Sequence, residues 1–327
     1  MKVGFKNILV FFLRIIGLIG CFLLVFYIVD IKLLASSLNQ LSGWVVLFAL
    51  IIAFLRLWLV SIRWQLLNTD AAKQLSRWQY YRYMIISSTC NLFMPGALGG
   101  DIARSVLVFR TVETNRSANI LAVLVDRIIG FTSIIMLGTI ACLISPALPS
   151  RSHYLLFLLA LIGFFLSALA IAVSSTLNHL LIKVLKQLGR WGRNLIDLIN
   201  VWQGVIKFYH KNPKRMFLAL LLCVPIHSSW FIIVYILARN IGIDIPFLSI
   251  SMVTCLVWVI SAVPLTFAGL GVRELSFVYL LSLQGITAEF ATALSLHQFA
   301  IIVLVAMIGI PFIWIGNLKP MDQILTS

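Results

Sequence analysis

Long uninterrupted apolar segments dominate the sequence and restrict the chain to folds that cross a membrane. Segments 8–29, 44–64 and 216–238 each run for about 20 residues, which a helix needs to span the hydrocarbon core. Only 11% of the 327 residues are charged, whereas soluble domains have about 25%. A β-barrel would alternate polar and apolar residues along short strands. The sequence therefore predicts an all-α polytopic membrane protein.

The excess of basic residues indicates how the chain is oriented. The formal net charge is +15, and without a basic soluble domain this charge favours cytoplasmic loops facing anionic lipid over nucleic-acid binding. Lys2 and Lys6 precede the first apolar segment, which is too long for a signal peptide. Basic residues also follow segment 44–64. We expect both termini and the 63–82 loop in the cytoplasm, and the 30–42 loop outside.

Six apolar segments are long enough for full spans, and two others are interrupted. The six spans are 8–29, 44–64, 118–144, 154–173, 216–238 and 293–316. Segment 84–98 is short and polar with arginines on both sides, which favours a re-entrant helical hairpin on the cytoplasmic face. Segment 247–284, broken at Pro264, is the matching hairpin from the outer face. Counting each hairpin as one crossing gives eight spans, and this alternative stays open.

The order of spans and hairpins is the same in both halves of the chain, with opposite orientation. We interpret residues 1–327 as a single membrane domain with an inverted-topology repeat, its halves being 1–145 and 154–318. Segment 177–215 is basic, with apolar residues at steps of three and four, which predicts an amphipathic helix on the cytoplasmic surface. In transporters with inverted repeats, the substrate lies between broken helices near mid-membrane.

The first break combines helix-breaking residues with a charged pair. Its candidate binding residues are Asn91, Pro95, Gly99, Gly100, Asp101 and Arg104. Asp101 is a suitable N-cap for a new helix, whose free N–H groups form an anion site, and it shares a helix face with Arg104. The functional interpretation is a phosphate or carboxylate headgroup held by the backbone and by Arg104. The structural interpretation is a helix cap with an arginine that reaches the interface.

The second break repeats these features with the candidates Gly269, Gly271, Arg273 and Glu274. Neighbouring helix residues point about 100° apart, so Arg273 and Glu274 are not expected to pair with each other. We expect them to meet Asp126 or Arg127, which lie about 12 Å deep in segment 118–144. Ionisable residues at such depth are candidates for substrate binding, with a structural ion pair as the alternative. Arg56 is a weaker candidate, because it could reach the interface.

The remaining polar residues indicate no cofactor, metal or catalytic site. The five cysteines lie singly in apolar segments, as buried structural thiols do. Serine-hydrolase, zinc-protease, Walker and dinucleotide-binding motifs are absent. His227 and His297 lie within spans, where a proton relay and a simple interhelical hydrogen bond are both open. We expect no metal, no cofactor and no catalytic residue.

Three motifs occur in order along the chain: NLFMPGALGGDIARS at 91–105, VLVDRIIGF at 123–131 and PLTFAGLGVRELSF at 264–277. Together they resemble the signatures of the lysylphosphatidylglycerol synthase/flippase transmembrane domain family. Two residues depart mildly from the usual pattern: Ala268 stands where glycine is common, and Asp126 where glutamate is frequent. The resemblance covers nearly the whole chain. It implies an integral protein of the plasma membrane, the inner membrane of a bacterium, that moves lipids between leaflets.

The implied substrate is an anionic or aminoacylated phospholipid, or a polyprenyl-type lipid, carried along a polar path between two broken helices. In bifunctional family members a soluble domain performs aminoacyl transfer. This chain ends at Ser327, directly after its last span, so we expect transport without synthase activity. Two alternatives stay open. One is a headgroup transferase with Asp101, Asp126 or Glu274 as base, and the other is a non-catalytic partner of a lipid-modifying enzyme.

Overall fold

The described part of the chain is a bundle of helices. The computed structural model describes residues 23, 27–68, 74–93, 99–112, 116–144, 154–159, 161–163, 182–183, 185–186, 196, 199, 203, 210–262 and 269–315. Throughout these residues the regular structure is helical and contains no strand, which confirms the all-α prediction. Most of the first and fourth predicted spans, the 145–153 loop and most of segment 177–215 lie outside the described residues.

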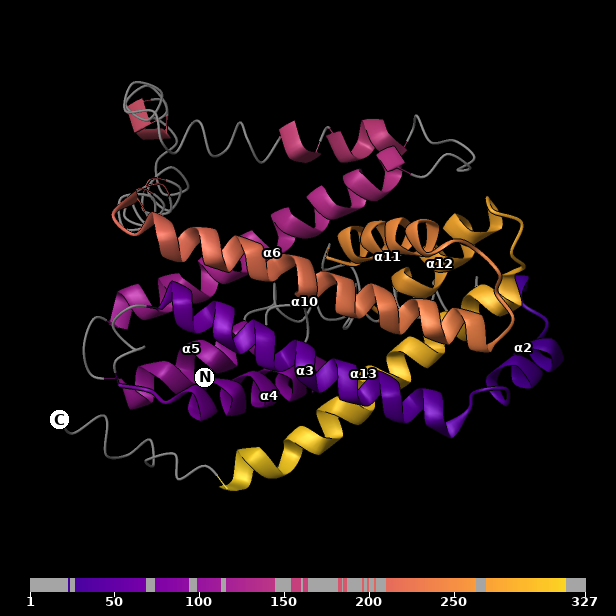
Figure 1. Ribbon diagram of the computed structural model, residues 1–327, viewed down its shortest axis with the longest axis horizontal. Coiled ribbons are helices and arrows are strands. Elements are labelled where there is room, and N and C mark those ends of the chain that lie inside the picture. The colour runs from indigo at the N-terminus through magenta and orange to yellow at the C-terminus, as the bar shows by residue number, and fades with distance from the viewer. Residues whose placement is uncertain are drawn as a thin grey trace.

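Four helices in the described ranges are long and apolar enough to cross a membrane (Figure 1). They are α3 (Gly43–Leu67), α6 (Arg116–Ile144), α10 (Pro213–Asn240) and α13 (Ala288–Ile315). These helices coincide with four of the predicted spans, at 44–64, 118–144, 216–238 and 293–316. Their outer faces expose large apolar side chains such as Ile51, Phe217 and Met307, as expected of a surface that lies against lipid.

Capping residues explain where two of the helices begin. Pro213 is the first residue of α10, a position that lacks an intrahelical partner for its N–H and suits the fixed φ of proline. α2 (Ile31–Leu38) follows Asp30, whose carboxylate accepts hydrogen bonds from the N–H groups of Lys32 at 2.8 Å and Leu33 at 3.3 Å. The predicted 30–42 loop therefore contains a short helix, because its acid serves as an N-cap.

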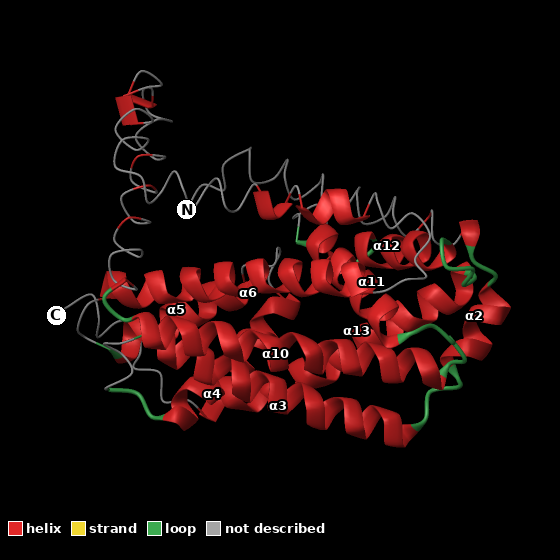
Figure 2. Cartoon of the chain, turned by 45° about the horizontal axis from the view of Figure 1, so that its top comes forward, coloured by secondary structure: helices red, strands yellow, loops and turns green. Residues whose placement is uncertain are grey.

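Two pairs of shorter helices lie at opposite ends of the bundle (Figures 1 and 2). α4 (Arg77–Phe93) packs against α5 (Gly99–Thr111) at one end, and α11 (Phe247–Ser261) packs against α12 (Val272–Ser282) at the other. The longest of them, α4, has 17 residues. That length is about 25 Å of helix, less than the roughly 30 Å of a hydrocarbon core. The connecting segments 94–98 and 263–268 lie outside the described residues.

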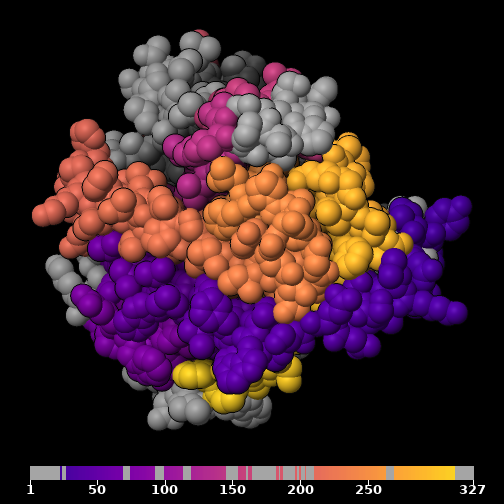
Figure 3. Space-filling view, turned by 45° about the vertical axis from the view of Figure 1, so that its right-hand side comes forward, coloured from indigo at the N-terminus to yellow at the C-terminus, as the bar shows by residue number. Residues whose placement is uncertain are grey.

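The long and short helices contact each other in matching pairs. α3 packs along α10, and Figure 3 shows the indigo surface of α3 beside the orange surface of α10 and α11. α4 packs against α13, and α11 packs against α6. A Cβ on Gly309 of α13 would overlap Thr89 of α4, and a Cβ on Gly138 of α6 would overlap Cys255 of α11. Glycine is therefore required at both crossings, as is common where helices approach closely in membranes.

Each of these two crossings also contains a hydrogen bond from a side chain to the backbone of the neighbouring helix. Thr89 Oγ1 donates to the carbonyl of Ala306 at 2.9 Å. Cys255 Sγ donates to the carbonyl of Ile134 at 3.0 Å. In apolar surroundings such bonds satisfy groups that would otherwise lack partners, so they hold α4 on α13 and α11 on α6.

Candidate functional site

A cavity of about 420 Å³ lies in the middle of the bundle, and α3, α4, α5, α6, α10, α11, α12 and α13 all contribute to its wall. The lining residues lie at 126–134 on α6, 226–230 on α10 and 298–305 on α13. These positions are about 15 Å or more from the ends of their helices, at the usual rise per residue. The cavity therefore reaches the middle of these three long helices, and along α3 it extends to Arg63, near the end of that helix. In a membrane, polar groups at the middle of such helices are costly without partners.

Asp126 is the centre of a buried ion-pair network that joins α3, α5 and α6. Its Oδ1 accepts from Arg63 Nε at 2.8 Å, and its Oδ2 accepts from Arg104 Nη1 at 2.9 Å. The three side chains are at most 6% exposed. A Cβ on Gly130, one turn after Asp126, would lie 3.2 Å from Arg63 Nη2, so glycine leaves room for the guanidinium. The network provides partners for charges that would be costly to bury alone.

Asp101 extends this network toward the end of the bundle where α4 and α5 lie. Its two carboxylate oxygens accept from Arg104 of the same helix and from Arg127 of α6. The expected pairing of Asp101 with Arg104 is therefore present. The prediction that Asp101 is the N-cap is wrong, because α5 begins at Gly99 and Asp101 lies in its first turn. An acid there still interacts favourably with the positive end of the helix dipole.

Asn91 and Gly100 hold α4 and α5 together at the first break. Asn91 Oδ1 accepts from the N–H of Gly100 at 2.7 Å, one of the N–H groups that a helix leaves free at its start. A Cβ on Gly100 would overlap Ser87 and Asn91, so the close approach requires glycine. Part of the predicted backbone anion site is thus occupied by Asn91. Gly99 is buried, and Pro95 lies outside the described residues.

Arg273 and Glu274 pair with each other, so the prediction that they would diverge is wrong. Glu274 Oε1 accepts from Arg273 Nε at 3.1 Å and Nη2 at 2.5 Å, and from Ser295 Oγ at 3.0 Å. Glu274 Oε2 accepts from the N–H of Gly271 at 2.5 Å, in a capping box at the start of α12. This cap turns the carboxylate back toward Arg273. Asp126, the expected partner, already has two arginine partners.

The glycines of the second break set the position of α12. Gly269 and Gly271 have φ values of 73° and 82°, in the left-handed region that residues with a Cβ rarely adopt. A Cβ on Gly269 would also lie 3.2 Å from Ser261 Cβ. The turn directs the start of α12 toward the cavity, and Arg273 is part of its wall.

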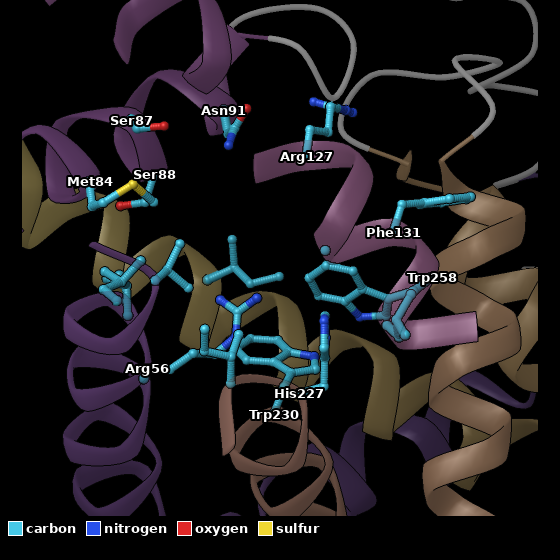
Figure 4. Close-up of a pocket in the computed structure, with 18 of the residues that line it drawn as sticks. Arg56, Met84, Ser87, Ser88, Asn91, Arg127, Phe131, His227, Trp230 and Trp258 are labelled. Atoms are coloured by element: carbon cyan, nitrogen blue, oxygen red, sulfur yellow. The ribbon is translucent and has the colours of Figure 1, made fainter. Parts of the chain in front are cut away.

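Arg56 lies in the cavity between two tryptophans (Figure 4). Its Cζ is 5.3 Å from the ring centroid of Trp230 and 5.6 Å from that of Trp258, within the range of cation–π attraction. Within the described ranges no carboxylate pairs with Arg56, and its Nε has no hydrogen-bond partner. Sequence reasoning gave Arg56 too little weight. It lies about 20 Å from Gly43 and about 16 Å from Leu67 along α3, too deep to reach an interface.

Two other cavity arginines also lie over aromatic rings. The Cζ of Arg104 is 5.2 Å from the Trp64 ring centroid, and that of Arg273 is 4.8 Å from the Phe299 ring centroid. Aromatic faces therefore hold guanidinium groups in place on α5 and α12 as well as on α3. The sequence prediction also omitted Arg63, because an arginine near the end of a helix is expected to reach the interface. Its role in the cavity wall becomes visible only through its contact with Asp126 in the structure.

Cations exceed anions on the cavity wall. Its charged lining residues are Arg56, Arg63, Arg104, Arg127, Arg273, Asp101 and Asp126, a formal excess of three positive charges, or two when Glu274 behind Arg273 is included. Some polar lining atoms have no hydrogen-bond partner among the described residues, including Trp230 Nε1, Ser261 Oγ and Gln298 Oε1. A buried polar atom without a partner is costly, so this wall is suited to a polar, negatively charged group.

The two histidines have hydrogen-bond partners on neighbouring helices. His227 Nε2 is 3.0 Å from Ser133 Oγ, and His297 Nε2 is 3.2 Å from the carbonyl oxygen of Leu38. These contacts favour the interhelical hydrogen bond over the proton relay. No group of histidine, cysteine and carboxylate side chains in the described part of the chain could hold a metal ion.

Comparison with known proteins matches one family model to the part of the chain that contains the cavity. The sequence model of a protein family described as "Lysylphosphatidylglycerol synthase TM region" matches residues 10–309. The matched region contains every residue of the cavity wall. No curated protein and no solved structure matches the chain.

Proposed function

The chain belongs to the lysylphosphatidylglycerol synthase transmembrane region family, and from this premise we propose that it is a flippase that moves a lipid between the two leaflets of a membrane. Family membership and the apolar helices support a lipid-related function in a membrane. The observation that carries the proposal is the arginine-rich cavity at mid-membrane depth. A headgroup passing through it would meet fixed charges while the acyl chains stay in the bilayer.

The arginines lie at several depths along the proposed path. Arg104 and Arg127 belong to the network beside the α4–α5 hairpin, and Arg273 comes from the α12 hairpin at the other end. Arg56 and Arg63 are about 10 Å apart along α3. A negatively charged headgroup could therefore bind a guanidinium group at each depth along the proposed path. These contacts would offset the free-energy cost of removing the headgroup from water.

We further propose that α4–α5 and α11–α12 are re-entrant hairpins of an inverted-topology repeat. Exchanging α3 with α10, α4 with α11, α5 with α12 and α6 with α13 maps the helix contacts onto one another. The α4–α13 contact then corresponds to the α11–α6 contact, and α5–α6 to α12–α13. The glycine crossings at Gly309 and Gly138 correspond in the same way. This correspondence supports a substrate site between the two broken helices.

We propose a location in the plasma membrane, the inner membrane of a bacterium, with both termini in the cytoplasm. Arg77, Arg110 and Lys214 lie where α4 begins, α5 ends and α10 begins, at the same end of the bundle (Figure 1). The loops at the opposite end contain Asp30 and Asp244. Positive charge concentrated at one end supports a cytoplasmic position for that end.

Transport of fluorescent phospholipids by the purified protein in vesicles tests the flippase proposal. We expect Arg104→Ala and Arg273→Ala each to slow transport at least about tenfold, because each removes a charged donor from the path. Arg239→Ala is the control, since Arg239 is 47% exposed at the end of α10 and far from the cavity wall. Size-exclusion chromatography verifies folding, and Arg104→Lys or Arg273→Lys replaces an alanine variant that is unstable. Wild-type rates in both cavity variants would contradict the proposal.

We propose that the lipid leaves the cavity chemically unchanged. Each carboxylate considered as a base accepts from an arginine, namely Asp101, Asp126 and Glu274, which supports a role in holding guanidinium groups. Product formation by purified protein in detergent, where there is no second leaflet, would favour a headgroup transferase instead. A lipid-modifying enzyme as partner stays a prediction, to be tested by co-purification.

A further inference from the structure

We propose that the cavity selects a lipid with a net-negative phosphate headgroup and rejects a headgroup that contains an ammonium group, with Arg56 as the central contact. The proposal rests on the proposed flippase function for its transport readout, and its binding readout is separate. On this view phosphatidylglycerol fits the cavity better than its aminoacylated derivatives, although the family description mentions a lysylated lipid.

The available charges on the cavity wall are the first argument. Both oxygens of Asp126 accept from Arg63 and Arg104, and both oxygens of Asp101 accept from arginines. Glu274 accepts from Arg273, from a serine and from a backbone N–H. No carboxylate among the described residues of the wall is therefore left to bind an ammonium group. That group would lie among cations at low dielectric, where like charges repel strongly.

Arg56 is the second argument. Its contacts with Trp230 and Trp258 are to ring faces, which stabilise the cation without using its N–H donors. The guanidinium therefore keeps its planar fork of donors, a geometry that fits two oxygens of a phosphate. Because a buried cation without an anion is costly, a phosphate at this position gains more from Arg56 than from arginines already paired with aspartate.

Neutral polar atoms elsewhere on the cavity wall fit the rest of such a headgroup. Gln298 is 1% exposed and its Oε1 has no hydrogen-bond partner in the described ranges, and the same is true of Trp230 Nε1 at 6% exposure. The indole N–H donates only, so it suits a phosphate oxygen. The amide oxygen of Gln298 accepts, so it suits a headgroup hydroxyl. Together the wall offers donors for a phosphodiester and an acceptor for a polyol.

Binding of short-chain lipids to the purified protein in detergent tests this selectivity. The probes are dioctanoyl phosphatidylglycerol, its lysyl ester and dioctanoyl phosphatidylcholine. We expect phosphatidylglycerol to bind at least about tenfold more tightly than the lysyl ester. Arg56→Gln should weaken phosphatidylglycerol binding about tenfold or more, since it removes a charge-assisted hydrogen bond. Arg56→Lys keeps the positive charge but loses the planar fork of donors. Its affinity for phosphatidylglycerol should lie between those of the wild type and Arg56→Gln.

The matched control is Arg82→Gln on α4. Arg82 also lies over an aromatic ring, with its Cζ 5.8 Å from the Tyr83 ring centroid, but it does not line the cavity. This variant makes the same change of charge outside the site, so its binding of all three probes should equal that of the wild type. Thermal unfolding of each variant verifies that the protein is folded.

Gln298→Glu is expected to reduce or abolish the preference for phosphatidylglycerol if the inference is right. The change places a carboxylate on the wall with little change of shape. We expect the ratio of lysyl-ester to phosphatidylglycerol affinity to rise at least about tenfold, as the new charge repels phosphate and attracts the ammonium group.

The possible outcomes separate this inference from the flippase proposal. Equal or tighter binding of the lysyl ester, or unchanged phosphatidylglycerol binding by folded Arg56→Gln and Arg56→Lys, would overturn the selectivity. Transport of phosphatidylglycerol and its lysyl ester at equal rates would also overturn the selectivity, but it would support the flippase function. If neither lipid is transported while binding is charge-selective, the flippase proposal fails and the binding site remains.

Discussion

The arginines of the cavity differ in the groups that they contact: some pair with carboxylates, and one contacts aromatic rings. Arg63 and Arg104 share Asp126 and connect helices from different parts of the chain. Arg56 has aromatic rings as its neighbours and no carboxylate in the described ranges. Removing a partner from the first kind leaves an uncompensated charge in apolar surroundings. At the residue scale the paired arginines are therefore expected to matter for stability, and Arg56 for binding.

Asp126→Asn is expected to destabilise the protein strongly. The amide keeps the shape of the carboxylate, but its NH₂ group faces an arginine donor and the negative charge is lost. Breaking a buried ion pair in this way costs about 3–5 kcal/mol. Thermal unfolding in detergent should therefore show a large decrease in melting temperature. A melting temperature equal to that of the wild type would mean that the network does not hold the helices together.

Asp244→Asn is the matched control for this change. Asp244 is 85% exposed and pairs with Arg239, which is 47% exposed. Exposed ion pairs contribute little to stability because water screens them. The same substitution there should leave the melting temperature almost unchanged.

Helix length separates the two kinds of element in the bundle. α3, α6, α10 and α13 have the length and hydropathy of membrane spans. α5 has 13 residues and α12 has 11, which is too short to cross the hydrocarbon core. Each short helix begins at glycines and packs on its neighbour, so its free N-terminal groups are enclosed by protein, away from lipid. These features favour hairpins that enter and leave on the same side.

Cysteine labelling from the two sides of the membrane distinguishes hairpins from single crossings. In a background with the five native cysteines replaced by alanine, single cysteines are placed at Arg77 and Thr111, and at Pro246 and Ser282. These positions are exposed and lie at the outer ends of the two helix pairs. Re-entrant hairpins predict that the first two positions react from the cytoplasmic side and the last two from the outside.

Eight single crossings predict a different result in the same experiment. Arg77 and Thr111 would then react from opposite sides, because α4 and α5 together would cross the membrane once. Labelling of this kind would exclude the inverted repeat. Ser36, exposed on α2, lies outside in both topologies and serves as the reference. Lys211, exposed before α10, gives a second test, because it is cytoplasmic with two hairpins and outside with eight single crossings.

At the scale of the whole molecule, two close helix crossings resemble each other, and each involves one of the shorter helices. α4 meets α13 at Thr89 and Gly309, and α11 meets α6 at Cys255 and Gly138. In transporters built from inverted repeats, the halves move relative to each other around a fixed central site. If this protein works in that way, the two halves would move against each other at these crossings.

Side chains larger than glycine at these crossings are expected to slow transport and to lower the melting temperature. A Cβ on Gly138 or Gly309 would overlap the neighbouring helix, so Gly138→Ala should push α11 away from α6 and Gly309→Ala should push α4 away from α13. Gly43→Ala on α3 is the matched control, because nothing lies within 4 Å of an added Cβ there. Wild-type transport in vesicles and wild-type melting temperatures in both crossing variants would show that the close contacts are not needed.

Much of the architecture follows from the sequence, because the membrane imposes simple requirements on it. Long apolar segments must form helices, so the spans near 44–64, 118–144, 216–238 and 293–316 were predictable from composition and length. Glycine and proline in such segments require enclosed or wet surroundings, which identified both breaks. The spacing of Asp101 and Arg104 gave their pairing, since residues three apart share a helix face.

Only the tertiary structure decides which charged groups meet. Arg63 and Asp126 lie on different helices, and no local pattern relates them, because their contact depends on how α3 packs beside α6. Glu274 turns toward Arg273 because a capping box holds its carboxylate, which overrides the direction expected from helix geometry. Arg56 is one arginine in an apolar helix until α10 and α11 bring Trp230 and Trp258 to it. Helix formation, capping and pairing within one helix depend on residues that are close in the sequence, so the sequence predicts them. Compensation of buried charges depends on contacts between residues that are far apart in the sequence, so only the tertiary structure decides it.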